Sequence, residues 1–127
     1  MVAWNIELLS SNQSTAIDAA RSIAGVVRAS TGGERSISGL QALGFVLARR
    51  GVVQVSMNLH DAEAAAERGD TLHAIRTAIA GLARAHGVEI GESEIVGLVQ
   101  ERVLRAGGDP DDLHIRGGWE RAVLERR

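Results

Sequence analysis

The sequence predicts an α+β domain of the ferredoxin-like type, with the element order β-α-β-β-α-β. Three observations lead to this prediction: an unbroken apolar/polar alternation over residues 52–59, and apolar residues at helical spacing in two stretches, 13–30 and 71–86. In this arrangement both helices lie on one face of an antiparallel sheet. The other face is then available for a partner sheet or a ligand.

The segment 52–59 is the clearest strand. Successive side chains of a strand point to opposite sides of the sheet, so alternation indicates one buried face. One set of side chains is wholly apolar: Val53, Val55, Met57 and Leu59. The opposite set, which begins at Val52, carries amides and a hydroxyl at Gln54, Ser56 and Asn58. Such groups suit a covered face, because they can be hydrogen-bonded whereas burying a charge costs much more.

The remaining elements follow in chain order. We expect strands over 2–9, 40–47 and 88–99, a first helix over 13–30 behind the capping cluster 10–12, and a second helix over 71–86. Asp70 is predicted to cap the second helix and Gly87 to end it. The helices should bury Ile23, Val27, Ile75 and Ile79 against Val53, Val55 and Met57.

The connections are less strongly specified. Residues 49–51 read as a hairpin turn, and 61–69 as an exposed loop or a short helical turn. Thr31-Gly32-Gly33 should end the first helix, and Gly91 and Gly97 are candidate bulge positions in the last strand. Short helices are expected near 100–106 and 119–126, on either side of a polar loop at 107–112.

Size and composition exclude several functions. The chain of 127 residues forms one domain, 1–127, with a net charge of −2, no cysteine and no lysine. Thiolate and Schiff-base catalysis are therefore excluded, and nucleic acid or an anionic membrane is not expected as a partner. The three aromatic residues, Trp4, Phe45 and Trp119, are too few to stack bases. With no membrane-spanning run and no leader pattern, we expect a cytoplasmic protein.

The candidate binding residues lie on the uncovered face of the sheet. Asn5, Gln54, Ser56 and Asn58 should share that face, together with Glu7. From the pattern alone, a solvated surface and a covered one are both open. Glu94 is a further candidate, but its facing is ambiguous, because Val88 and Ile90 set one parity and a bulge at Gly91 would shift it.

No catalytic residue and no metal site is predicted. His60, His73, His86 and His114 have no partner at the spacing of helical zinc sites, so structural or solvated roles are expected. The glycine pairs at 32–33, 107–108 and 117–118 match no phosphate-binding motif and are expected to mark turns. The acidic run 109–112 lacks the spacing of a calcium-binding loop.

Two runs carry a family resemblance, VQVSMNL at 53–59 and SEIVGLV at 93–99. Together with AWNIELLS at 3–10, GLQALG at 39–44 and VLERR at 123–127, they occur in the order of one known domain. The chain resembles the C-terminal subdomain of glutamate formiminotransferase, the folate-dependent half of formiminotransferase-cyclodeaminase. Gln100 departs from the proline usual there, and the segment after it is shorter than the family's long helix.

The resemblance implies a role in histidine degradation, with tetrahydrofolate as substrate and no metal. It implies that Asn5, Gln54, Ser56, Asn58 and Glu94 face a folate cleft that an N-terminal subdomain closes. It also implies a catalytic histidine in that N-terminal subdomain, which this sequence lacks, as it lacks the cyclodeaminase domain.

Three hypotheses follow. The first is half of an enzyme that transfers a formimino group from formiminoglutamate to tetrahydrofolate, with an N-terminal-subdomain partner chain. The alternative is a non-catalytic module of the same fold, which binds a folate-like ligand or covers its polar face by self-association. A third is a fragment of a longer enzyme. In the first two, an oligomer is expected.

Overall fold

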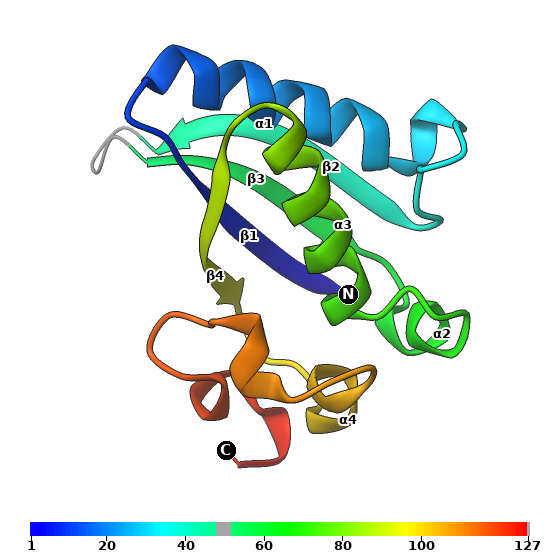
Figure 1. Ribbon diagram of the computed structural model, residues 1–127. Coiled ribbons are helices and arrows are strands. Elements are labelled where there is room, and N and C mark those ends of the chain that lie inside the picture. The colour runs from blue at the N-terminus through cyan, green and yellow to red at the C-terminus, as the bar shows by residue number, and fades with distance from the viewer. Residues whose placement is uncertain (48–51, 127) are drawn as a thin grey trace.

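The computed structural model describes residues 1–47 and 52–126, and it has the predicted order of elements (Figure 1). The main elements are β1 (Val2–Leu9), α1 (Gln13–Val27), β2 (Leu40–Leu47), β3 (Val52–Leu59), α2 (Ala62–Glu67), α3 (Leu72–Ala85), β4 (Glu89–Val96) and α4 (Glu101–Arg105). The bounds of β1, β2 and β3 are those predicted from alternation. The predicted turn at 49–51 lies outside the described residues.

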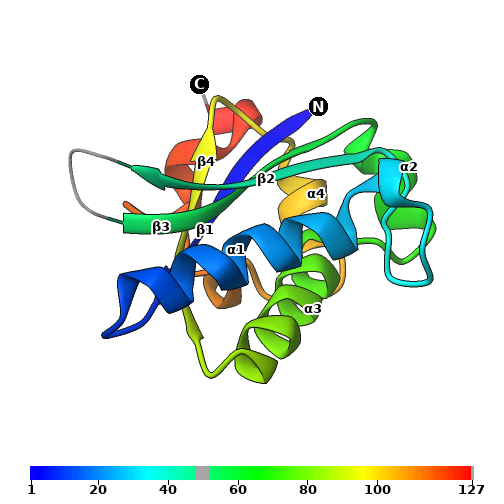
Figure 2. The same ribbon diagram turned by 90° about the horizontal axis from the view of Figure 1, so that it is seen from above.

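The four strands form one antiparallel sheet in the order β2-β3-β1-β4. Helices α1 and α3 lie on the same side of this sheet, as Figure 2 shows from above. The short helix α2, in the segment 61–69, is the helical turn that the sequence allowed. The fold is thus the predicted ferredoxin-like α+β arrangement, with one face of the sheet covered by helices.

The core lies between the sheet and the two long helices. In β1 and β3, Trp4 is paired with Met57 and Ile6 with Val55, and all four side chains point to the helix side. Ile23, Val27, Ile75 and Ile79 are buried against them, with at most 1% of each residue exposed. The predicted packing of α1 on β3 is confirmed, whereas α3 makes its main contacts with α1 and with β4 (Glu89–Val96) at the other edge of the sheet.

Helix α1 lies unusually close to β2 at Gly44. A Cβ atom built on Gly44 would lie 2.6 Å from the carbonyl carbon of Ala20. Backbone atoms of a helix cannot move aside as a flexible side chain can, so this contact requires glycine. Gly44 therefore lets α1 approach the edge of the sheet.

The ends of the helices differ from the predictions in two places. Thr71, and not Asp70, caps α3: its side chain accepts a hydrogen bond from the Ala74 amide, and its backbone is extended as an N-cap requires. Helix α1 ends at Val27, before the predicted Ser30, and a short 3₁₀ turn at Ala29–Thr31 precedes Gly32. Gly87 follows α3 with a positive φ of 73°, as expected.

The segment 97–126 differs most from the predictions. The last strand ends at Val96, three residues early, and the expected helix over 119–126 is two 3₁₀ turns, Trp119–Ala122 and Leu124–Arg126. One parallel bridge, from Ser93 to Ile115, joins the segment to β4, and a second, from Val99 to Val123, joins two parts of the segment itself. The segment lies beside the end of β4 (Figure 1). Pairing with a strand edge and packing of Trp119 replace regular helix here.

Among residues 1–47 and 52–126, no helix combines the length and apolar character needed to cross a lipid bilayer.

Candidate ligand-binding face

The sheet side opposite α1 and α3, here called the open face, carries mainly polar residues with a few apolar ones among them. Strand pairing places its members in rows across the sheet. The central row runs from Leu43 through Ser56 and Asn5 to Glu94. The open face consists of Ala3, Asn5 and Glu7 of β1, Gln41 and Leu43 of β2, Gln54, Ser56 and Asn58 of β3, and Glu94 and Val96 of β4. All five predicted binding residues therefore lie on one surface.

Asn5 and Glu94 are joined across the central row. The Asn5 side-chain amide donates a hydrogen bond of 3.3 Å to Oε1 of Glu94, and both residues are half-buried. A carboxylate has several further acceptor positions, so this bond does not exhaust Glu94. Ser56 lies on the other side of Asn5. The row thus offers an acceptor-rich carboxylate beside an amide and a hydroxyl.

The facing of Glu94 depends on a bulge in β4. Ile90 and Ser93 both lie on the helix side, opposite Leu8 and Ile6 of β1. Between these pairs the register shifts, so Gly91 and Glu92 together oppose the single residue Glu7. The bulge allows Ile90 to face the helices while Glu94, beyond the bulge, lies on the open face. This settles the facing of Glu94 that the sequence left ambiguous.

Gln54 differs from the other candidates because the chain itself buries it. It is 5% exposed in the single chain. Its side chain therefore needs no partner protein for its burial, and it is less accessible to a ligand than Ser56 or Asn58, which are half-buried. Ligand recognition is better supported for the central row than for Gln54.

An ion pair borders the open face beside the bulge. Nη2 of Arg116 lies 2.6 Å from Oε1 of Glu7 and 3.8 Å from Oε1 of Glu92. Arg116 and Glu7 are 109 positions apart in the chain, and no pattern in the sequence pointed to their contact. The ion pair ties the segment 97–126 to the open face, since Arg116 reaches around the outer edge of β4.

A hollow of about 490 Å³ continues the open face beyond Glu94. It lies between the end of β4 and the loop that carries Arg116, and the guanidinium of Arg121 lies over Gly117. The hollow is lined by Glu94, Ile95, Val96, Gly97, Ile115, Arg116, Gly117, Gly118, Arg121 and Ala122. A carboxylate and two arginine side chains therefore line one hollow together with apolar residues. No pattern in the residues alone indicated this hollow.

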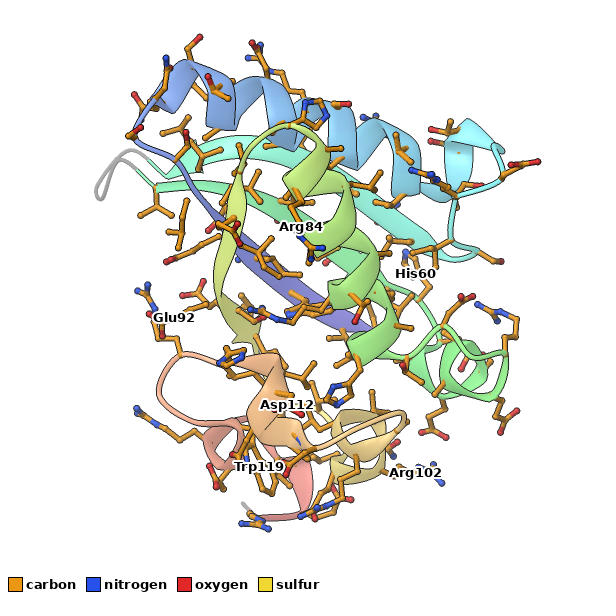
Figure 3. All side chains as sticks on the ribbon, in the orientation of Figure 1. His60, Arg84, Glu92, Arg102, Asp112 and Trp119 are labelled. Carbon is orange, nitrogen blue, oxygen red and sulfur yellow. The ribbon has the colours of Figure 1, made fainter. Side chains whose placement is uncertain are left out.

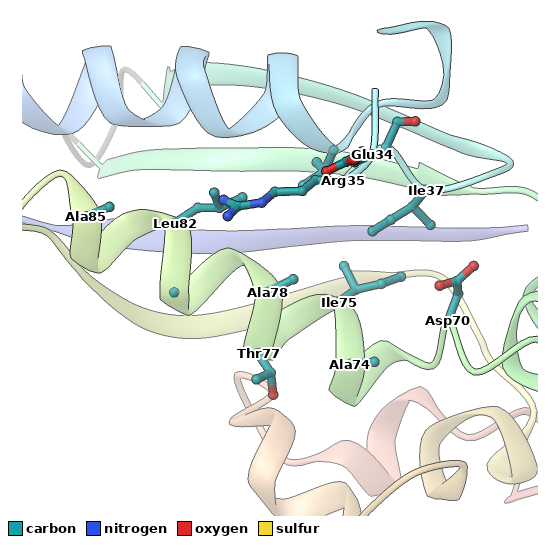
Figure 4. A pocket seen from close by; sticks show the side chains of 13 residues that line it. Glu34, Arg35, Ile37, Asp70, Ala74, Ile75, Thr77, Ala78, Leu82 and Ala85 are labelled. Atoms are coloured by element: carbon teal, nitrogen blue, oxygen red, sulfur yellow. The ribbon is translucent and has the colours of Figure 1, made fainter. Parts of the chain in front are cut away.

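A second hollow, of about 630 Å³, lies on the helix side of the molecule (Figure 4). It runs along α3 past Ala74, Ala78 and Leu82, and Glu34 and Arg35 form its opposite rim. None of the predicted binding residues lines it. It is separated from the open face by the sheet.

The four histidines lie away from the strand positions of the open face. His60 follows β3 and is exposed, His86 is the residue after α3, and His114 is exposed with a φ of 49°. His73 is half-buried, with Nε2 3.0 Å from the Leu104 carbonyl oxygen. Among the described residues, no three His, Asp or Glu side chains gather as they would around a metal ion.

The acidic run 109–112 has structural contacts. The Asp109 side chain accepts from the Asp111 amide and so caps the 3₁₀ turn Pro110–Leu113. Asp111 accepts a hydrogen bond of 3.0 Å from the Trp119 indole. These contacts hold the segment 97–126 together.

The fold and the open face define an α+β domain with one polar sheet surface suited to a ligand or a second domain. Comparison with known proteins identifies the family. Residues 3–109 match the family described as Formiminotransferase domain, and the chain belongs to that family. This confirms the resemblance seen in the sequence.

The chain is also 33% identical over all of its 127 residues to a glutamate formimidoyltransferase of Thermoplasma acidophilum. It spans 38% of the length of that relative.

Proposed function

We propose that the chain forms one wall of the folate-binding cleft of a glutamate formimidoyltransferase. In this proposal it corresponds to the C-terminal subdomain that its sequence resembles, and an N-terminal subdomain supplies the opposite wall. The observation that carries the proposal is the central row of the open face, where Ser56, Asn5 and Glu94 are in register. Family membership supports the same reading.

The chemistry of the central row suits a reduced pterin. The edge of a pterin presents N–H donors, and the half-buried carboxylate of Glu94 accepts such bonds. Hydrogen bonds to a charged group are about twice as strong as neutral ones. Asn5 and Ser56 can both donate and accept, so they complement the mixed pattern of ring nitrogens and oxygen.

The proposed reaction requires an acid–base group to transfer a proton. When a formimino group moves from formiminoglutamate to tetrahydrofolate, one C–N bond breaks and another forms. The attacking amine loses a proton and the departing amine gains one. A positioned acid–base group should carry that proton. The described histidines lie off the open face, so we assign the acid–base group to the partner subdomain.

The proposal is tested by complementation. The chain is mixed with the region of the Thermoplasma relative that it does not span, and formimino transfer to tetrahydrofolate is followed. Transfer is expected from the mixture and from neither component alone. Glu94→Gln should lower the transfer, whereas Glu34→Gln, on the helix side, should not. Transfer by the chain alone would refute the division of labour proposed here.

Self-association is the second candidate function, and two residues favour it. Leu43 and Val96 stand at opposite ends of the open face and are 61% and 59% exposed. Apolar side chains beside polar, uncharged groups are typical of a surface that another protein covers. In this alternative a second copy of the chain covers the face, with or without a folate-like ligand.

A further inference from the structure

Arg76 of α3 is a buried cation without a carboxylate partner among the described residues. The residue is 9% exposed. Its guanidinium donates to the Gly91 carbonyl at 2.6 Å and to the Ser93 hydroxyl at 2.5 Å, and both acceptors are neutral. Burial lowers the pKa of the Arg76 guanidinium from its ordinary value. Burying a charge against neutral acceptors is costly, so the position of this group calls for an explanation.

The two acceptors of Arg76 lie at the bulge in β4: Gly91 is within the bulge, and Ser93 is the next paired residue after it. At a bulge the ladder between neighbouring strands is interrupted, so a backbone carbonyl there needs another donor. Arg76 supplies that donor to Gly91 from the helix side. The same side chain also fixes the hydroxyl of Ser93, the first residue paired with β1 beyond the bulge.

Ser93 is held from the opposite side by the segment 97–126. Its amide donates to the His114 carbonyl at 2.9 Å, and its carbonyl accepts from the Arg116 amide at 2.8 Å. Ser93 is 1% exposed. The residue directly before Glu94 is therefore fixed by three hydrogen bonds from two different elements.

The alternation of side chains along β4 explains why the hydrogen bonds to Ser93 matter. Without the bulge, one half of β4 would turn its side chains to the other face, because side chains alternate with a period of two. If the half beyond the bulge slipped by one residue, Glu94 would move to the helix side and Ser93 to the open face. Anchoring Gly91 and Ser93 together prevents that slip.

We propose that Arg76 is a positioning residue for Glu94: it holds the bulge from the buried side and so keeps Glu94 opposite Asn5 on the open face. The consequence for ligand binding rests on the proposed function. The positioning itself does not, and it can be measured without any ligand.

The test compares Arg76→Met and Arg76→Lys with Arg84→Met, a matched change of an exposed arginine on the same helix (Figure 3). Hydrogen exchange of the Ser93 and Arg116 amides is measured by NMR relative to the Val55 amide, which reports opening of the central sheet. Using this ratio removes any change in global stability. The cross-strand contact between Asn5 and Glu94 is followed in the same samples.

Arg76→Met should raise the exchange ratio at Ser93 and Arg116 at least about tenfold, since hydrogen bonds to a charged group are lost. It should also weaken the contact between Asn5 and Glu94. Arg76→Lys should restore part of both effects, and Arg84→Met should change neither. Unchanged ratios and contacts in Arg76→Met would overturn the proposal. If Arg76→Met does not fold, Ser93→Ala removes one acceptor only, and the same ratio must then rise at Arg116.

A second measurement separates this inference from the proposed function. Binding of 5-formyltetrahydrofolate, a stable reduced folate, is titrated with the wild type, Arg76→Met and Glu94→Gln. Both variants should bind about tenfold more weakly. If Arg76→Met loosens the bulge while Glu94→Gln binds folate normally, the positioning holds and the folate proposal fails. If both bind weakly but the bulge is unchanged, the positioning fails.

Discussion

Asn5 and Glu94 are 89 positions apart in the sequence and lie directly opposite each other on β1 and β4, joined by a hydrogen bond of 3.3 Å. Their contact depends on the long pairing of an edge strand with the first strand and on a bulge two residues before Glu94. It brings an amide and a carboxylate together at the centre of the open face.

Changing the amide alone should show whether the central row recognises a ligand. Asn5→Ala removes the side-chain amide of the central row and should weaken the binding of 5-formyltetrahydrofolate about two- to tenfold, as expected when one neutral hydrogen bond between Asn5 and the ligand is lost. Gln41→Ala, at an exposed position of the same face, serves as the matched control and should bind normally. Calorimetric titration measures both. Equal affinities in all three proteins would remove Asn5 from the site.

The faces of β3 can be tested by charge. Val55 is fully buried on the helix side, so Val55→Asp leaves an unpaired carboxylate in the core. The cost is about 3–5 kcal/mol, a large part of the roughly 5–15 kcal/mol that stabilises a typical domain. The neighbouring change Ser56→Asp places the same group on the open face and should leave the domain folded. Denaturant unfolding followed by circular dichroism compares the two, and a cooperative Val55→Asp variant of normal stability would reverse the assignment.

Two glycines should respond to alanine with opposite signs. Gly44→Ala drives a methyl group against the Ala20 backbone and should destabilise the domain by about 1–3 kcal/mol, as overpacking does. A Cβ atom built on Gly81 of α3 would have no neighbouring atom within 4 Å. Gly81→Ala should therefore stabilise the domain by about 0.4–1 kcal/mol. Thermal unfolding of the pair measures both, and a neutral Gly44→Ala would mean that α1 can move away from β2.

Association through the open face should respond to charges placed on it. Leu43→Lys with Asn58→Lys puts two cations among the residues that a partner surface would cover, and like charges at an interface oppose assembly. Sedimentation of the wild type should show a dimer or larger species, and the double variant should be a monomer. Arg84→Met, on the helix side, should sediment as the wild type does. A wild type that stays monomeric at high concentration would exclude self-association through this face.

Acid should loosen the segment 97–126 through Glu101. A hydrogen bond from Arg105 lowers the pKa of Glu101 below its ordinary value of 4.5, and Arg126 also contacts this carboxylate. Because the folded pKa is depressed, the stabilisation is complete above pH 4.5 and is lost as the pH falls through the folded pKa.

The readout is the indole N–H resonance of Trp119. The guanidinium groups of Arg105 and Arg126 lie 5.0 Å and 4.9 Å from the centre of its ring. The resonance should shift as Glu101 is protonated, and Glu101→Gln should show a shifted resonance already at neutral pH. The indole of Trp4, buried in the core, is the internal reference. If the Trp119 resonance shifts neither with pH nor in Glu101→Gln, the ion pairs of Glu101 do not influence the ring of Trp119.

The sheet was predictable from the sequence because alternation and helical spacing are local signals. They located β1, β2 and β3 to the residue, and they indicated the face shared by Asn5, Ser56 and Asn58. Register then follows from burying one side of each strand. Glu94 could be named as a candidate, but the face on which it lies depends on a bulge in β4. The alternation of residues in this strand suggested a bulge but did not show whether it was present.

The rest of the site depends on contacts between distant residues. Arg116 reaches Glu7 because the segment 97–126 folds back along β4. Nothing in the sequence around Arg116 distinguishes it from the other arginines. Arg76 likewise has no neighbouring residue pattern that marks its guanidinium as buried. The residue types favour Asp70 over Thr71 as the cap of α3, because Asp ranks above Thr at N-cap positions, but the structure uses Thr71.

Because Ile115 pairs with Ser93, the two edge strands of the sheet, β2 and β4, differ in how available their backbones are for further pairing. Along β4, the backbone groups of Ser93 that would meet another chain are already bonded to residues 114 and 116. In the described part of the chain, β2 has a neighbouring strand on one side only. An incoming strand that sought backbone partners would therefore add at β2. Continuous growth of the sheet by adding strands at both edges would also need the outer edge of β4, where this chain's own residues already pair with the backbone of Ser93.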